Sequence, residues 1–149
     1  MGTFSVKKGF TLIELIIVLA VIGIILSMAV YGHSFSGNHT LRFYARQLSN
    51  DIINIRQKSM TTGVIDTIYL NYNGYIIKNN TNVQKQVVYK QNYEIYWTAE
   101  GGREISFGYD GQILGKGNTI TVKNTKTGRK MDITIVPGSG RVLLYDKIY

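Results

Sequence analysis

The sequence predicts an α+β protein in which a long N-terminal helix precedes a head of antiparallel β-strands. Three observations support this: an apolar run near the N-terminus, an apolar stripe at helical spacing after it, and a period-2 pattern with turn signals over the remaining chain. The 149 residues suffice for one compact domain with a short appendage. We expect an apolar helix at 10–30, a bend and an amphipathic helix at 31–63, and a β head at 64–149.

Composition excludes several classes of protein. The chain has no cysteine, so disulfide scaffolds, thiolate zinc sites and cysteine nucleophiles are ruled out. Its 44% apolar and 17% charged residues are typical of a folded chain with a core. The net charge is +8, from 17 basic against 9 acidic residues, which favours anionic partners such as nucleic acid or membrane surfaces.

The apolar run from Phe10 to Val30 has the length of a bilayer span. Of its 21 residues 17 are apolar and one, Glu14, is charged. As a helix it would be about 31 Å long, which matches the hydrocarbon core of a bilayer. Lys7 and Lys8 come directly before it, and Arg42 is the next basic residue. The positive-inside rule therefore predicts a cytoplasmic N-terminus and a head outside.

Three interpretations of this run remain open. A secretory signal peptide would be cut near Ser27-Met28-Ala29, but its apolar part is usually shorter and has no acid. A plain membrane anchor fits the length, yet a carboxylate in hydrocarbon costs about 2–3 kcal/mol. A chain cut between Gly9 and Phe10 has a new α-amino group, which can pair with Glu14 of a neighbouring subunit. This pair would set the register of packed helices.

The residues from Lys7 to Leu15, KKGFTLIEL, carry a family resemblance. They resemble the leader and cleavage site of type IV prepilins. The resemblance implies a leader peptide at 1–9, cleavage after Gly9 by a prepilin peptidase, and methylation of Phe10 by the same enzyme's N-methyltransferase activity. It also implies assembly with other pilin or pseudopilin subunits, guided by Glu14. Removal of the leader would leave 15 basic and 9 acidic residues, a net charge of +6.

A helix is predicted again after a weak stretch. The residues from Tyr31 to Asn38 include two glycines and several polar side chains, so we expect a bend or a melted segment there. An apolar stripe follows at spacings of three and four, and Gly63 is the expected stop. The stripe consists of Leu41, Tyr44 or Ala45, Leu48, Ile52 and Ile55, whereas Arg42, Arg46, Gln47, Asn50, Asp51 and Lys58 take the other faces.

The rest of the chain alternates short apolar runs with turn signals. Two hairpins are expected, one around Asn71-Tyr72-Asn73-Gly74 and one around residues 124–129. The expected strands are Val64–Leu70, Tyr75–Lys78, Val87–Lys90, Glu94–Thr98, Glu104–Phe107, Gln112–Leu114, Thr119–Lys123, Lys130–Val136 and Arg141–Tyr145.

The head has a second, looser family resemblance. The amphipathic helix, Ile105-Ser106-Phe107 followed by Gly111, and Gly140-Arg141-Val142 are similar to the GspH/FimT class of minor pilins and pseudopilins. This class belongs to type II secretion systems, type IV pili and competence systems. The resemblance implies a stalk helix with two antiparallel sheets.

No catalytic or metal-binding constellation is visible. The segment Gly115-Lys116-Gly117 lacks P-loop spacing, and no Ser or Thr follows its lysine. His33 and His39 lie before the β region, which excludes a Ser-His-acid triad there. Glu100, Glu104 and Asp110 lack EF-hand spacing and are expected to be solvated loop acids. We therefore expect no enzyme activity, no cofactor and no metal.

DNA binding is the alternative function. Residues 101–149 carry 8 basic against 4 acidic residues, and Tyr109 and Tyr145 could offer rings that stack on bases. The resemblance to FimT-type proteins implies DNA binding through a Gly-Arg-x-Arg motif. Gly140-Arg141 matches the first half of this motif, whereas Leu143 replaces the second Arg. The candidate DNA-binding residues are Lys123, Lys126, Arg129, Lys130 and Arg141.

The preferred reading is a minor pilin or pseudopilin subunit anchored in the cytoplasmic membrane. After processing it would enter a type II secretion pseudopilus or a type IV pilus, with its head outside. The alternative is a DNA-binding minor pilin of a competence filament.

Overall fold

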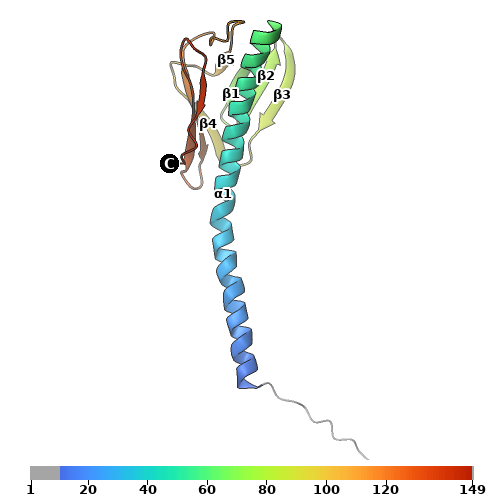
Figure 1. Cartoon of the computed structure of the whole chain (residues 1–149), viewed down its shortest axis with the longest axis vertical. Coiled ribbons are helices and arrows are strands. Elements are labelled where there is room, and N and C mark those ends of the chain that lie inside the picture. Colours follow the sequence, from blue (N-terminus) through green and yellow to red (C-terminus); the bar gives the residue numbers. More distant parts are fainter. Residues whose placement is uncertain (1–10, 149) are drawn as a thin grey trace, which may run out of the picture. The chain divides into compact units, whose positions relative to one another are not determined.

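A computed structural model describes residues 11–148, and it describes all of their side chains except those of 28–37 (Figure 1). The chain divides into two compact units, residues 1–36 and residues 37–149. One helix, α1 (Leu12–Thr62), contributes to both units. Eight strands lie in the second unit, which we call the head.

The first unit contains the N-terminal part of α1. Its described apolar side chains from Leu12 to Leu26 are largely exposed, so this part of the helix has no core of its own. Within the described part of the chain, no helix combines the length and the apolarity that a membrane span requires. The predicted span, 10–30, includes Phe10 and three side chains that lie outside the described residues.

The backbone of α1 remains helical through residues 31–38. The prediction of a melted stretch at this position was therefore wrong. Each glycine costs the helix only about 1 kcal/mol relative to alanine. The segment has no proline, so every residue keeps the N–H group that helical hydrogen bonding needs.

In the head, α1 buries the predicted apolar stripe. Leu41, Ala45, Leu48 and Ile52 are fully buried, and the other stripe residues are nearly so. Asp51, which the spacing places on another face of the helix than the apolar stripe, is only 7% exposed. Helical spacing alone does not show that polar partners in the sheet cover this side chain.

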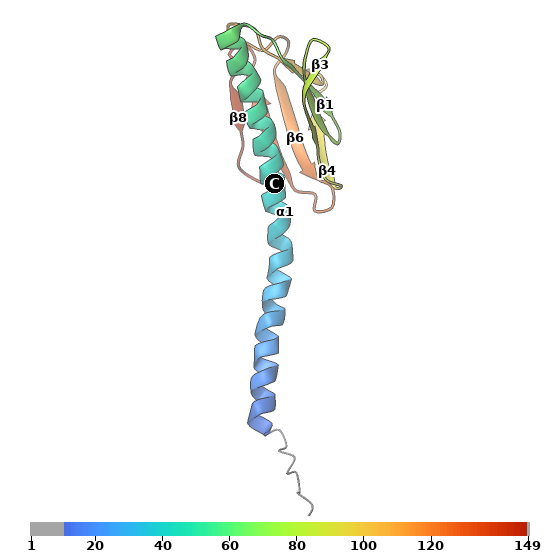
Figure 2. The same cartoon turned by 90° about the vertical axis from the view of Figure 1, so that its right-hand side faces the viewer.

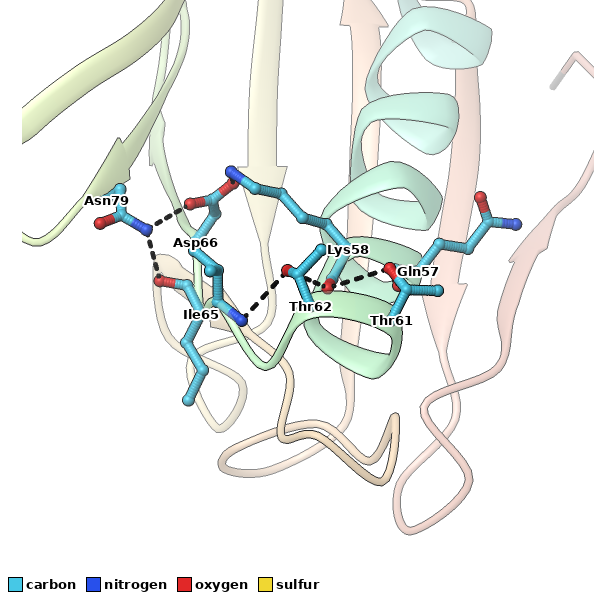
Figure 3. Close-up of polar contacts among 8 residues, drawn as sticks. Gln57, Lys58, Thr61, Thr62, Ile65, Asp66 and Asn79 are labelled. Carbon is cyan, nitrogen blue, oxygen red and sulfur yellow. Dashed lines mark hydrogen bonds and ion pairs between the residues drawn. The ribbon is translucent and has the colours of Figure 1, made fainter.

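The helix ends at the predicted glycine. Gly63 has a φ of +67°, and its N–H donates to the carbonyl of Ser59 at 3.0 Å. Glycine adopts this left-handed conformation without a Cβ penalty. Figure 3 shows the polar contacts around this end, where the hydroxyls of Thr61 and Thr62 donate to carbonyls of the last turns.

The first sheet has the strand order β3-β2-β1-β5. Its antiparallel strands are β1 (Thr67–Asn71), β2 (Gly74–Asn79), β3 (Asn82–Val88) and β5 (Glu104–Ser106). The predicted hairpin is confirmed, because Asn71 pairs with Gly74 across a two-residue turn. β3 begins five residues before the predicted start at Val87. Its backbone pairs with β2, but its side chains are mostly exposed and give no clear apolar alternation.

The second sheet has the order β4-β6-β7-β8. It contains β4 (Tyr93–Trp97), β6 (Asn118–Asn124), β7 (Lys130–Ile135) and β8 (Val142–Leu144), all antiparallel. The strict alternation of buried and partly exposed residues in β6 explains why this strand was predictable. The strand predicted at 112–114 is reduced to one bridge, in which Ile113 pairs with Phe107.

The core of the head lies between α1 and the inner faces of both sheets, and Figure 2 shows the helix beside both of them. The largest fully buried side chains include Leu48 from the helix, Tyr75 from the first sheet and Met131 from the second. The architecture is thus α+β, as the sequence predicts.

Candidate functional site

The N-terminal candidate site combines a carboxylate with exposed apolar side chains. Gly9 and Phe10 lie outside the described residues. Glu14 lies in the first turn of α1, and its N–H donates to the carbonyl of Thr11 at 3.1 Å. Its side chain is exposed, as are those of Leu12, Ile13 and Leu15. An exposed apolar helix with one acid near its start is a surface for association, and the acid can bind a cation there.

Four of the five candidate DNA-binding residues gather at one hairpin. Lys123 in β6 lies directly opposite Lys130 in β7, and Lys126 and Arg129 belong to the loop between them. The loop is ordered by Asn124, whose Oδ1 accepts from the N–H groups of Lys126 and Thr127 at 3.0 and 3.1 Å. We call these four residues the basic hairpin.

The basic hairpin has acidic and aromatic neighbours on the same sheet face. Glu94 in β4 lies opposite Lys123, and the Lys123 ammonium sits 6.0 Å from the centre of the Tyr96 ring. The Tyr96 hydroxyl donates to the Glu94 carboxylate, which raises the tyrosine's pKa. Glu94 offsets part of the basic charge, and Tyr96, rather than Tyr109, is the aromatic ring beside the lysine.

Arg141 does not join the basic hairpin. Its carbonyl accepts from the N–H of Val136, which is six residues beyond Lys130 along the β7 direction. At the rise of an extended strand this places Arg141 about 20 Å from the hairpin end. The structure therefore separates Arg141 from the other candidate residues.

The glycine of Gly140-Arg141 has a structural role. A Cβ on Gly140 would lie 2.1 Å from the carbonyl oxygen of Gly111, and its φ is +61°. Arg56 from α1 holds both loops, because its Nε donates to the Gly111 carbonyl at 2.8 Å and its Nη2 to the Ser139 carbonyl at 3.2 Å. Arg56 could not be identified from the sequence, because no spacing in the sequence links it to either glycine.

A buried polar cluster joins α1 to the first sheet. The Tyr75 hydroxyl donates to Asp51 at 2.5 Å, and the Lys85 ammonium donates to the same carboxylate at 2.7 Å. Burial is the main cause that raises the pKa of Tyr75 above its ordinary value, and the hydrogen bond to the Asp51 carboxylate raises it further. Burial also raises the pKa of Tyr89, whose ring stacks on Tyr44. These groups hold the helix on the sheet. Asp51, Tyr75 and Tyr89 are buried, whereas the Lys85 side chain is 42% exposed.

The described residues contain no cluster of metal-ligating side chains. Among them, no group of three or more His, Cys, Asp or Glu side chains could hold a metal ion. Glu100, Glu104 and Asp110 are exposed, as expected for loop and strand-edge acids.

The N-terminal region matches a known family motif. Residues 5–30 match the prokaryotic N-terminal methylation motif. No curated protein matches the sequence. The motif covers the predicted cleavage site, Glu14 and the apolar run.

The fold of the chain is that of known minor pilins and pseudopilins. It is similar to the type IV minor pilin FimU of Pseudomonas aeruginosa, with a TM-score of 0.62 and 14% identity over 77% of this chain and 96% of that chain. It is also similar to the minor pseudopilin EpsH of the Vibrio cholerae type 2 secretion system, with a TM-score of 0.57 and 10% identity over 70% of this chain and 95% of that chain. The chain thus joins a prepilin-type N-terminal motif to a pilin-like α+β fold.

Proposed function

We propose that this chain is a minor pilin or pseudopilin subunit. A prepilin peptidase cuts it after Gly9 and methylates the new amino group of Phe10. Residues 10–30 then anchor the subunit in the cytoplasmic membrane, and the head lies outside. The observation that carries the proposal is the exposed Glu14 on an exposed apolar helix, inside the matched methylation motif.

Glu14 guides the docking of the subunit into the filament. Once the leader is removed, the amine of Phe10 is a cation at the start of the same helix. Burying the Glu14 carboxylate in a helix bundle is favourable only when an opposite charge pairs with it. Pairing with the Phe10 amine of a neighbouring subunit neutralises both charges and fixes the helix register. The subunit performs no reaction, and filament assembly is its activity.

The filament is a type II secretion pseudopilus or a type IV pilus. The similar structures come from one system of each kind. Their fold supports a subunit of such a filament, and the basic charge of the head is compatible with both.

Substitution of Glu14 tests this proposal. Glu14→Val removes the charge that docks the subunit, so we expect normal membrane insertion and loss of the chain from sheared filaments. Glu14→Asp keeps the carboxylate and should restore part of the incorporation. Glu104→Val, which removes an exposed acid of the head, is the matched control. Immunoblots of membrane and filament fractions measure the outcome, and normal incorporation of Glu14→Val would refute the docking role.

DNA binding by the head is the second candidate function. It is favoured by the contact of Lys123 with the exposed Tyr96 ring and by Lys130, which lies opposite Lys123 on β7. Stacking and phosphate neutralisation both contribute to single-strand binding. We expect Lys126→Ala with Lys130→Ala to weaken binding and to lower the salt slope by about 2. Arg141→Ala is the control, because it is remote from the hairpin. Absence of binding by the wild type at low salt would exclude this function.

A further inference from the structure

The exposed side of α1 in the head carries one large apolar side chain between two hollows. Phe43 is 61% exposed, although its helix neighbour Tyr44 is buried. An open groove of about 570 Å³ on one side is lined by Arg42, Phe43 and Arg46. A second hollow, of about 310 Å³, is lined by Phe43, Tyr44 and Lys90. The ring thus forms a ridge with accessible space on both sides.

The surroundings of this ridge are cationic. Arg42 and Arg46 lie on its groove side, and both reach the carboxylate of Asp146, at 3.8 and 3.1 Å. Lys90 lies on the other side. One carboxylate cannot satisfy the donors of two guanidinium groups, so both arginines retain N–H groups that face solvent. Lys85 is paired with the nearly buried Asp51 and adds no net charge.

An exposed aromatic ring flanked by arginines is typical of a protein–protein interface. Aromatic and arginine side chains are enriched at the centres of such interfaces, whereas lysine is depleted. Burial of the exposed Phe43 ring would supply binding free energy, and the arginines would select a partner that carries carboxylates. We call Arg42, Phe43, Arg46 and Lys90 the Phe43 ridge.

We propose that the Phe43 ridge docks an acidic surface of a different pilin-like subunit, which places an apolar side chain against Phe43 and carboxylates against Arg42 and Arg46. A second copy of this chain is disfavoured, because each copy carries a net charge of +8, or +6 without the leader. The proposal rests on the proposed function, which supplies the partner subunit. It adds a docking surface in the head to the docking step of Glu14.

Site-specific crosslinking of the full chain tests this interface. Phe43 is replaced by the photoreactive amino acid p-benzoylphenylalanine, which keeps a phenyl ring at position 43 of the ridge. The same replacement of Tyr109 is the matched control: Tyr109 is 81% exposed, and its loop is held by Arg56, about 20 Å along α1 from Phe43. Both variants are expressed with an affinity tag in the source cells and irradiated in native membranes.

We expect the label at position 43 to join a different subunit that has a prepilin motif, through a peptide rich in Asp and Glu. The label at position 109 should not give this adduct. Adding Arg42→Glu and Arg46→Glu to the chain labelled at position 43 should reduce the adduct about tenfold or more, since truncation or reversal of central contacts has effects of this size. Circular dichroism of the purified variants checks that the head remains folded.

Three results would overturn the inference: an adduct with a second copy of this chain, the same adduct from position 109, or no subunit adduct from position 43. Incorporation into filaments is measured in parallel. If the chain enters filaments but position 43 gives no subunit adduct, the inference fails and the proposed function stands. If the unmodified chain does not enter filaments, the proposed function fails.

Discussion

At the scale of single residues, backbone geometry explains Gly140, the glycine of the Gly140-Arg141 motif that could also be interpreted as part of a DNA-binding motif. Its positive φ and its close approach to the Gly111 carbonyl both require a residue without Cβ. Arg56 then joins the two loops through their carbonyl groups. A glycine at this position is therefore explained by packing alone, without any contact to DNA.

Gly140→Ala tests this explanation. The variant must strain its backbone and also displace the Gly111 carbonyl, so we expect the free energy of unfolding of the head to fall by about 3 kcal/mol or more. Gly138→Ala is the matched control, because Gly138 also has a positive φ (+75°) but open space around it, and it should cost about 1 kcal/mol. Urea unfolding of residues 38–149 measures both. Equal losses in the two variants would show that the contact with Gly111 is unimportant.

Residue-level prediction from the sequence succeeded where periodicity alone decides burial. The six apolar stripe residues of the helix are buried as expected. The roles of Asp51 and Arg56 could not be predicted from the sequence, because their partners are distant along the chain. Asp51 binds Tyr75 and Lys85, and Arg56 binds the carbonyls of Gly111 and Ser139. Likewise, the four residues of the basic hairpin could be grouped from the sequence, whereas the separation of Arg141 follows only from the register of β7 and β8.

At the scale of elements, the buried carboxylate of Asp66 connects the end of α1 to the first sheet. Asp66 accepts from Lys58 at 2.6 Å and from Asn79 Nδ2 at 2.8 Å (Figure 3). Its side chain is 5% exposed, whereas that of Lys58 is 41% exposed. The carboxylate thus links the last turns of the helix to the end of β2.

Asp66→Ala should lower the free energy of unfolding of the head by about 1–3 kcal/mol, because it leaves two donors without their acceptor at a largely buried site. Solvent around Lys58 keeps the loss below that of a fully buried pair. Asp146→Ala is the control, since it removes the half-exposed ion pairs with Arg42 and Arg46 and should cost less than about 1 kcal/mol. Thermal unfolding ranks the variants, and a larger effect of Asp146→Ala would contradict this account.

Elements were predictable where turn chemistry and alternation agree. The β1–β2 and β6–β7 hairpins follow from their Asn and Gly residues and from the alternating strands beside them. The start of β3 was predicted too far along the sequence. The side chains of β3 are mostly exposed because the strand lies at a sheet edge, and the local sequence pattern does not encode that position. The helix through residues 31–38 was missed because glycine weakens a helix without forbidding it.

At the scale of the whole molecule, the two units differ in how their apolar side chains are covered. The head has a continuous core shared by α1 and two sheets. The N-terminal part of α1 leaves its described apolar side chains exposed, with Glu14 among them. A self-sufficient head joined to an uncovered apolar helix is suited to assembly through that helix, with the head free to contact further partners.

The N-terminus of the mature chain shows whether the chain is a processed pilin-like subunit. Mass spectrometry of the protein isolated from its native membranes should find an N-methylated Phe10 as the first residue, and Gly9→Leu should leave residues 1–9 attached. An N-terminus after Ala29 would identify the apolar run as a secretory signal peptide. An uncut chain would identify it as a plain anchor. Either of these two results would contradict the assignment as a processed pilin-like subunit.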